Sequence, residues 1–195
     1  MTRQEVIAET VDNGFNVHDK YKGLTVEELQ QVAIDDALPF RVCALNVEGD
    51  LNVGMIARTA SLLGVEKFYI FGRRKIDSRS LVGAQNYLPI EKIAGLDKDG
   101  VLSLDLFKQF VQMEDIVPIF IEQGGVSIDD IEDTRVFRLP FGKICLVFGN
   151  EASGIPKEFM EGYKSISIPQ RGVLRSYNVA AAAAIIMWEF AKFYR

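Results

Sequence analysis

Apolar and polar positions follow one another along the chain in blocks that predict strands and helices in turn. Unbroken apolar runs rich in β-branched and aromatic residues predict buried strands. Segments that are apolar at every third or fourth position predict amphipathic helices between those strands. The predicted strands are residues 39–47, 66–72, 115–122, 143–149 and 165–168. The predicted helices are residues 24–38, 51–64, 102–113 and 176–195.

Local signals mark where several of these helices begin and end. Thr25 and Glu28 have the spacing of a capping box, in which each side chain accepts a hydrogen bond from the other residue's backbone N–H. Asn52 opens the helix over residues 51–64, where its ordinary role would be an N-cap, a role that it could combine with one in a binding site. Gly64 is placed to end that helix as a C-cap.

Strands that alternate with helices predict an α/β fold, with a mostly parallel sheet and helices on both faces. In such sheets, ligands bind beyond the carboxyl ends of the strands. Three loops there are rich in glycine, asparagine, serine and proline, and each leads from an apolar strand towards a helix. They are residues 45–54, 147–156 and 166–182. Three such loops in one small domain predict a composite site.

The three loops resemble the motifs of the SpoU (TrmH-type) family of the SPOUT superfamily, the knotted RNA ribose 2′-O-methyltransferases. The resemblance covers residues 40–195, and the motifs occur in order. The first motif is carried by Asn52, Gly54, Arg58, Thr59, Ala60 and Gly64. The second is carried by Phe148, Gly149, Glu151, Gly154 and Ile155. The third is carried by Ile166, Ile168, Pro169, Ser176, Asn178 and Val179.

For the architecture, the resemblance implies a methyltransferase domain over residues 40–195 that ends in a trefoil knot. Residues 1–39 match no RNA-binding module and are expected to form a short helical extension. The resemblance also implies a homodimer through the C-terminal region. The alanines of residues 180–184 would permit close helix approach there, although a core helix buried within one subunit is the alternative.

For the activity, the resemblance implies methyl transfer from S-adenosyl-L-methionine to a ribose 2′-hydroxyl of RNA, which leaves S-adenosyl-L-homocysteine. The sulfonium supplies the electrophile, so no metal is required, and the protein positions the reactants and manages one proton. A tRNA substrate is favoured over rRNA, because a small stem–loop suits a chain without a dedicated RNA-binding domain. One alternative is a module of the same fold that binds RNA and cofactor without turnover. Another is a Rossmann-type nucleotide enzyme, but the G-x-G-x-x-G loop is absent after the first strand.

The resemblance assigns five side chains to the reaction. Arg58 would contact RNA phosphate and act as the general base. Arginine side chains stay protonated in ordinary settings, so binding phosphate and stabilising the developing alkoxide are the safer roles. Arg58 lies about 200° around its helix from Ile56 and so points off the core, as it also would in a simple surface salt bridge. The five residues are Arg58, Asn52, Glu151, Ser176 and Asn178.

The resemblance implies that the cofactor is held largely by backbone groups. Without a Cβ, Gly149 would let the chain approach the adenosyl group. Ile168 would pack on the adenine face, unless it is ordinary strand-end core. Ser176 and Asn178 could instead cap the last helix, and Glu151 could compensate a helix dipole. The implied cofactor-binding residues are Ile121, Glu122, Gly149, Ile168, Ser176 and Asn178.

Charge limits where RNA could bind. The formal net charge is −5, so the attraction must come from a local patch or a second subunit. Residues 72–80 hold Arg73, Arg74, Lys75 and Arg79. We predict that they contact phosphate, because the rest of the chain is acidic. The alternative is a solvated basic loop.

The remaining features exclude several classes of protein. Cys43 and Cys145 lie in apolar runs and are predicted to be buried free thiols. His18 is the single histidine and is predicted to lie on the surface, which leaves a zinc site almost without ligands. The first ten residues have no signal-peptide core, and the apolar run over residues 179–187 is too short to span a membrane. We expect a cytoplasmic protein with no metal and no membrane partner.

Overall fold

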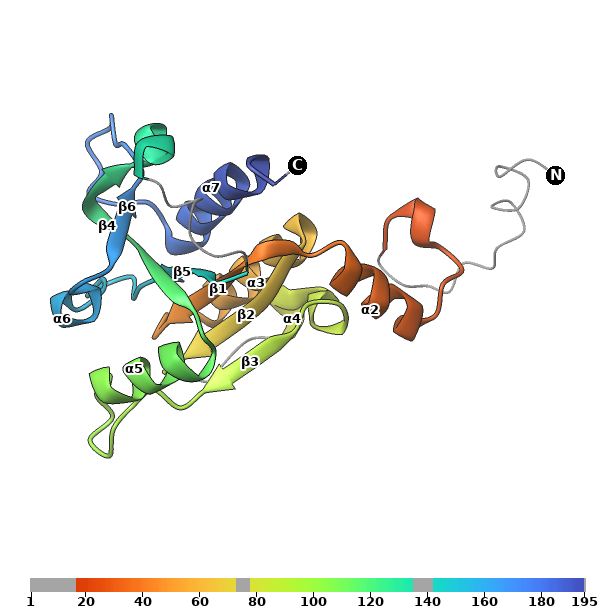
Figure 1. Cartoon of the computed structure of the whole chain (residues 1–195), viewed down its shortest axis with the longest axis horizontal. Coiled ribbons are helices and arrows are strands. Elements are labelled where there is room, and N and C mark those ends of the chain that lie inside the picture. Colours follow the sequence, from red (N-terminus) through yellow and green to blue (C-terminus); the bar gives the residue numbers. More distant parts are fainter. Residues whose placement is uncertain (1–16, 73–77, 135–141, 195) are drawn as a thin grey trace.

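The fold is built on a six-stranded, wholly parallel sheet, which Figure 1 shows. The structure is a computed structural model, and it describes residues 17–72, 78–134 and 142–194. The strand order is β3-β2-β1-β5-β4-β6. The strands are β1 Leu38–Leu45, β2 Val65–Phe71, β3 Ile90–Ile93, β4 Val117–Ser127, β5 Ile144–Phe148 and β6 Lys164–Ser167. The α-helices are α2 Val26–Asp35, α3 Asp50–Leu63, α4 Ser78–Leu81, α5 Leu104–Met113, α6 Lys157–Met160 and α7 Val179–Lys192. The 3₁₀ helices are η1 Asp19–Tyr21, η2 Ala84–Asn86 and η3 Ile128–Thr134. The predicted α/β fold with a parallel sheet is confirmed.

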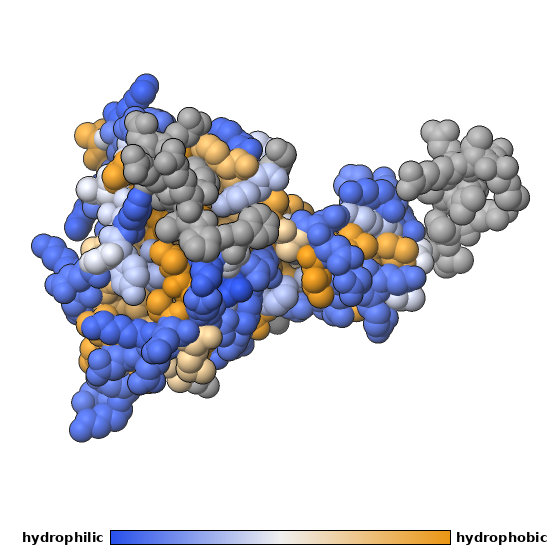
Figure 2. Space-filling model, viewed as in Figure 1, coloured by the Kyte–Doolittle hydropathy of each residue, from blue (hydrophilic) through white to orange (hydrophobic). Residues whose placement is uncertain are grey.

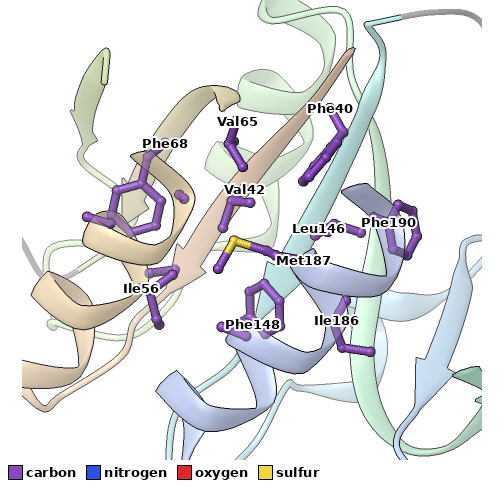
Figure 3. Packing of buried hydrophobic residues seen from close by; sticks show 14 of the residues in the cluster. Phe40, Val42, Ile56, Val65, Phe68, Leu146, Phe148, Ile186, Met187 and Phe190 are labelled. Carbon is purple, nitrogen blue, oxygen red and sulfur yellow. The ribbon is translucent and has the colours of Figure 1, made fainter. Parts of the chain in front are cut away.

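One face of the sheet is covered by α3 and α7. Figure 3 shows Ile56 of α3 and Met187 and Phe190 of α7 beside Val42 of β1 and Leu146 of β5. All five side chains are fully or almost fully buried. This packing brings the two helices that follow β1 and β6 next to each other, although β1 and β6 are not neighbours in the sheet.

The other face is covered by α5 and α6 through aromatic side chains. The ring centroids of Phe107 on α5 and Phe159 on α6 are 5.2 Å apart, and Phe107 also lies 5.4 Å from Phe71 of β2. Cys43 and Cys145 belong to this cluster as buried free thiols, as predicted.

No helix among the described residues is both long and apolar enough to cross a membrane.

The structure differs from the sequence predictions in two strands, β3 and β4. The strand β3 was missed, because it has only four residues and its two central side chains, Glu91 and Lys92, are exposed. The strand β4 continues beyond residue 122, through two glycines, because its end pairs again with β6 after a register shift between Ile121 and Val126. Glycine has low strand propensity, so local pattern ends this strand too early.

The N-terminal extension stands out from the body as a lobe made of η1 and α2, as Figures 1 and 2 show. The capping box of Thr25 and Glu28 is confirmed, with both hydrogen bonds formed. Leu29 is the buried residue of α2, and Gln30 Nε2 donates to the backbone carbonyl of Asn86 in η2 at 2.9 Å. His18 is exposed, as predicted. The lobe therefore docks on the body through α2 and η2.

The contact between α3 and α4 requires a glycine at position 54. A Cβ added to Gly54 would overlap the side chain of Ser80 on α4. We expect Gly54→Ala to lower the free energy of unfolding by about 1–3 kcal/mol, because an overpacked helix contact must shift to relieve the clash. Gly172→Ala is the control, since a Cβ there would meet no atom within 4 Å. Urea denaturation measures both, and equal losses in the two variants would contradict this explanation.

Candidate active site

The carboxyl ends of β1 and β5 lie side by side in the sheet, and Asn150 joins the loops that follow them. Asn150 is only 8% exposed. Its Nδ2 donates to the Asn46 carbonyl at 3.0 Å, and its Oδ1 accepts from the backbone N–H groups of Ala152 and Ser153 at 2.9 and 3.0 Å. A buried amide must satisfy its hydrogen bonds, so Asn150 fixes both loops. We did not single it out from the sequence, where its position between Gly149 and Glu151 was the available signal.

Glu151 links the same two loops from the solvent side. Its carboxylate accepts hydrogen bonds from the backbone N–H groups of Glu48 and Gly49 at 2.9 and 3.1 Å, and from Asn52 Nδ2 at 2.7 Å. A Cβ on Gly49 would lie 2.8 Å from Asn52 Nδ2, so glycine leaves room for this contact. The glycine in the turn after β1 therefore serves the Glu151–Asn52 pair.

The prediction that Asn52 caps α3 is wrong. The helix begins at Asp50, its N-cap is Gly49 without a side-chain hydrogen bond, and Asn52 is the third helical residue. The N–H groups of Glu48 and Gly49 just before the helix are bound by Glu151 instead. The Asn52 side chain is thereby left to bind other side chains.

The third loop joins this pair through Asn178. Its Oδ1 caps α7 by accepting from the N–H groups of Ala180 and Ala181 at 2.9 and 3.2 Å, and its Nδ2 donates to Asn52 Oδ1 at 3.1 Å. The side chains of Glu151, Asn52 and Asn178 thus form one chain of hydrogen bonds, which we call the three-loop network. Ser176 is exposed, and the cap of α7 is made by Asn178.

The residues predicted to bind a cofactor come from the middle of β4, from the loop after β5 and from the segment after β6. Glu122 Oε2 accepts from the Ile155 N–H at 3.1 Å and so ties β4 to the loop after β5. A Cβ on Gly149 would overlap Ile155, so packing within the loop already requires glycine there. Ile121 and Ile168 are half-buried against the core cluster and keep part of each side chain accessible.

The segment that follows β6 is open. Residues 169–178 are all exposed and contain neither helix nor strand. Gln123 Nε2 donates to the Arg175 carbonyl at 2.6 Å, and Asn178 ties the end of the segment to Asn52. Within the segment, the Tyr177 hydroxyl donates to the Pro169 carbonyl at 3.3 Å. The segment beside Ile168 is therefore open to solvent. Among the described residues, no three histidine, cysteine or carboxylate side chains gather to hold a metal ion.

Of the predicted basic residues, the structure describes Arg58 and Arg79. Arg58 is exposed on α3, six residues after Asn52 and thus about 9 Å further along the helix axis. Arg79 is exposed on α4. Arg73, Arg74 and Lys75 lie outside the described residues. Within one chain, the fold therefore joins Asn52, Glu151 and Asn178 and leaves Arg58 two helical turns away.

The hydrogen bonds to Glu151 also change its acidity. Burial raises the pKa of the Glu151 carboxyl, but the bonds from Asn52 and from the N–H groups of Glu48 and Gly49 outweigh burial and hold the pKa below its ordinary value of 4.5. A carboxyl with a lowered folded-state pKa stabilises the fold above its unfolded pKa, and this contribution is lost as the pH falls through the folded pKa.

We therefore expect the effect of Glu151→Gln on the free energy of unfolding to depend on pH. The variant should be less stable than the wild type at neutral pH, and the difference should shrink between about pH 5 and about pH 3 as the wild-type carboxylate becomes protonated. Urea denaturation across this range measures the difference. A difference that stays constant down to the lowest pH would show that the charge of Glu151 makes no contribution.

Comparison with known proteins decides the family. Residues 39–188 match the family model described as the SpoU rRNA methylase family. The chain belongs to this family. The resemblance predicted from the three motifs is thereby confirmed.

This SpoU-family chain is similar to curated tRNA (guanosine(18)-2′-O)-methyltransferases. It is 30% identical over 153 residues to the enzyme of Aquifex aeolicus, and this match covers 76% of this chain and 66% of that protein. It is 26% identical over 152 residues to the enzyme of Escherichia coli K12, which covers 76% of this chain and 61% of that protein. The chain thus spans about two thirds or less of the length of the curated relatives it matches.

Solved structures share the fold. The crystal structure of the A. aeolicus TrmH/SpoU tRNA modifying enzyme has a TM-score of 0.66 and 24% identity, and the match covers 86% of this chain and 81% of that one. The SpoU methyltransferase AviRb from Streptomyces viridochromogenes, in complex with AdoMet, has a TM-score of 0.60 and 24% identity over 81% of this chain and 58% of that one.

Proposed function

We propose that this SpoU-family chain transfers a methyl group from S-adenosyl-L-methionine to a ribose 2′-hydroxyl of RNA, with tRNA favoured over rRNA. The observation that carries the proposal is the three-loop network of Glu151, Asn52 and Asn178, which joins all three family motifs at the carboxyl edge of the sheet. The names of the curated relatives from A. aeolicus and E. coli, which are tRNA 2′-O-methyltransferases, support the choice of tRNA.

The surroundings of residues 169–178 suit the adenosine part of the cofactor. Ile121 and Ile168 offer accessible apolar surface for a flat ring, and the exposed backbone beside them offers donors and acceptors for its polar edge. When bound, the sulfonium supplies an electrophilic methyl group, and S-adenosyl-L-homocysteine is the product. We assign its binding to Ile121, Glu122, Gly149, Ile168, Ser176 and Asn178.

The chain's own residues position the RNA and manage its charge. Arg58 binds an RNA phosphate and stabilises the negative charge that develops on the ribose oxygen as its proton leaves. Asn52 and Glu151 hold the turn after β1 in place, and Asn178 couples that turn to the cofactor-binding loop. Ser176 contacts the reactants from the same loop. Arg73, Arg74, Lys75 and Arg79 contribute phosphate contacts that bring affinity without sequence preference.

A transfer assay separates this enzyme from a module of the same fold that only binds RNA and cofactor. The full chain is incubated with S-adenosyl-L-methionine carrying a labelled methyl group, and with total tRNA or total rRNA in parallel. We expect label to enter the tRNA. Cofactor binding in calorimetry without any transfer to either RNA would favour the non-catalytic module and would contradict the proposal.

We further propose that two copies of the chain associate through α3 and α7. These helices pack side by side and expose large apolar side chains, with Leu51 at 63%, Met55 at 53% and Trp188 at 46% exposure. Large exposed apolar side chains on two packed helices are candidates for an interaction surface. Sedimentation at micromolar concentration should show a dimer for the wild type and a monomer for Trp188→Asp. A wild type that sediments only as a monomer would contradict the dimer.

The trefoil knot, the domain division and the location in the cell are part of the same proposal. α7 follows the edge strand β6 yet packs on the sheet centre beside α3, so the chain crosses back over the sheet, as a C-terminal knot requires. An experimental structure in which the C-terminal segment passes through no loop of the chain would contradict the knot. We propose residues 40–195 as the methyltransferase domain, residues 1–39 as its extension, and the cytoplasm as the place of action.

A further inference from the structure

A cavity of about 670 Å³ lies between the N-terminal extension and the body, separate from the three-loop network. One wall is formed by η1 and α2, and the other by α3, the loop after α4, and η2. Its deeper surface is made of buried or half-buried apolar side chains. Among these are Leu29, Val32, Leu63, Leu81 and Leu88.

Both cations and aromatic rings line the cavity. Lys20 and Arg58 are exposed lining residues, and Asp36 is the acidic side chain among the described residues that line it. Tyr21 of the extension and Tyr87 of the body are half-buried lining residues. The ammonium of Lys20 lies 4.5 Å from the centre of the Tyr21 ring, so a cation and an aromatic ring are presented together.

This combination suits an unpaired nucleotide. The volume falls within the range of sites that enclose a small ligand. Unstacked RNA bases bind to aromatic side chains and apolar surface, while lysine and arginine bind the phosphates.

We propose that the cavity binds one unstacked nucleotide of the substrate RNA, roughly three nucleotides along the strand from the methylated one. The base lies against the tyrosine rings and the apolar side chains, its phosphate binds Lys20, and Arg58 binds a phosphate between this nucleotide and the methylated one. This inference rests on the proposed function, because it names the part of the chain that recognises the RNA.

Arg58 connects the cavity to the site of methyl transfer. It lines the cavity and lies about 9 Å along α3 from Asn52. At about 3.4 Å per nucleotide of a stacked strand, this separation corresponds to roughly three nucleotides. An RNA strand that runs along α3 would therefore pass from the three-loop network to the cavity within one loop. The extension then belongs to the RNA-binding surface and selects RNA that exposes an unpaired base.

Two measurements on the full chain test the inference. In the first, tRNA transcribed with 4-thiouridine is cross-linked to the protein by light, and the attached peptides are identified by mass spectrometry. In the second, kcat and KM for total tRNA are measured for Tyr21→Ala, Tyr87→Ala and Ala33→Phe. The last variant narrows the cavity from α2 without removing a ring. Gln31→Ala is the control, because Gln31 is exposed on α2 and does not line the cavity.

We expect cross-links to peptides that contain Tyr21 or Tyr87. We also expect each of the three cavity variants to raise KM for RNA about 10-fold or more, while kcat and cofactor affinity stay within about twofold of wild type. The Gln31→Ala control should have the wild-type KM. Cross-links confined to other peptides would overturn the inference, whatever the activity of the protein. So would methylation by all three variants with wild-type KM. A wild type that cross-links through the cavity but transfers no methyl group would instead overturn the proposed function alone.

Discussion

We expect the Arg58→Ala protein to transfer methyl groups about 100- to 1,000-fold more slowly than the wild type, with its fold and its cofactor affinity unchanged. This loss is typical when a donor that stabilises developing negative charge is removed. Because the Arg58 side chain is exposed on α3, its truncation removes no core contact. Single-turnover transfer to tRNA measures the rate, and calorimetry with S-adenosyl-L-methionine measures cofactor affinity.

Two further variants test whether the loss of rate is specific to the Arg58 guanidinium. Lys108→Ala removes an exposed cation from α5, on the opposite face of the sheet, and should leave the rate unchanged. Arg58→Lys keeps a positive charge but loses the planar, bidentate group, so only part of the rate should return. An Arg58→Ala protein that is as fast as Lys108→Ala would show that Arg58 is an ordinary surface arginine.

The second large effect is expected at Asn178. Its side chain both caps α7 and donates to Asn52, and these two roles can be separated. Asn178→Asp keeps the oxygen that caps α7 and loses the N–H donor to Asn52. The new carboxylate would face the Asn52 oxygen, and Asn52 cannot turn its amide round without presenting that oxygen to Glu151. We expect the transfer rate to fall about 10- to 100-fold, as for other groups that position reacting residues. The free energy of unfolding should change little, because aspartate caps helices well.

Asn178→Ala is the matched comparison, because it removes the cap and the link together. It should lose activity to a similar extent, and it should also lose about 1 kcal/mol of stability. Denaturation and single-turnover transfer measured on both variants separate the two contributions. An Asn178→Asp protein with the wild-type rate would show that the three-loop network does not control the reaction.

Local sequence pattern was sufficient for features decided within one turn or one strand. The capping box at Thr25 and the αL C-cap at Gly64 depend on residues a few positions apart, and both are present. The parallel sheet follows from strands alternating with helices. The short edge strand β3 was not predicted, because two exposed charged residues in a four-residue segment leave no periodic signal.

The site itself depends on contacts that local pattern cannot contain. Asn52 meets Glu151 and Asn178 across 99 and 126 residues of sequence, and Asn150 reaches Asn46 across 104. From the sequence alone, Asn52 is a good N-cap, and only the fold shows that Glu151 binds the N–H groups before α3 instead. The motifs predicted which residues belong to the site, and the structure added how three of them are joined.

The central claim is that the methyl group goes to a ribose oxygen, and the most direct measurement is the identity of the methylated nucleoside. Transfer RNA incubated with the full chain and S-adenosyl-L-methionine is digested to nucleosides and analysed by mass spectrometry with fragmentation. The proposed function predicts a nucleoside whose ribose carries the added methyl mass, absent when Arg58→Ala replaces the wild type. A methyl group found on a base, or no methylated nucleoside at all, would contradict it.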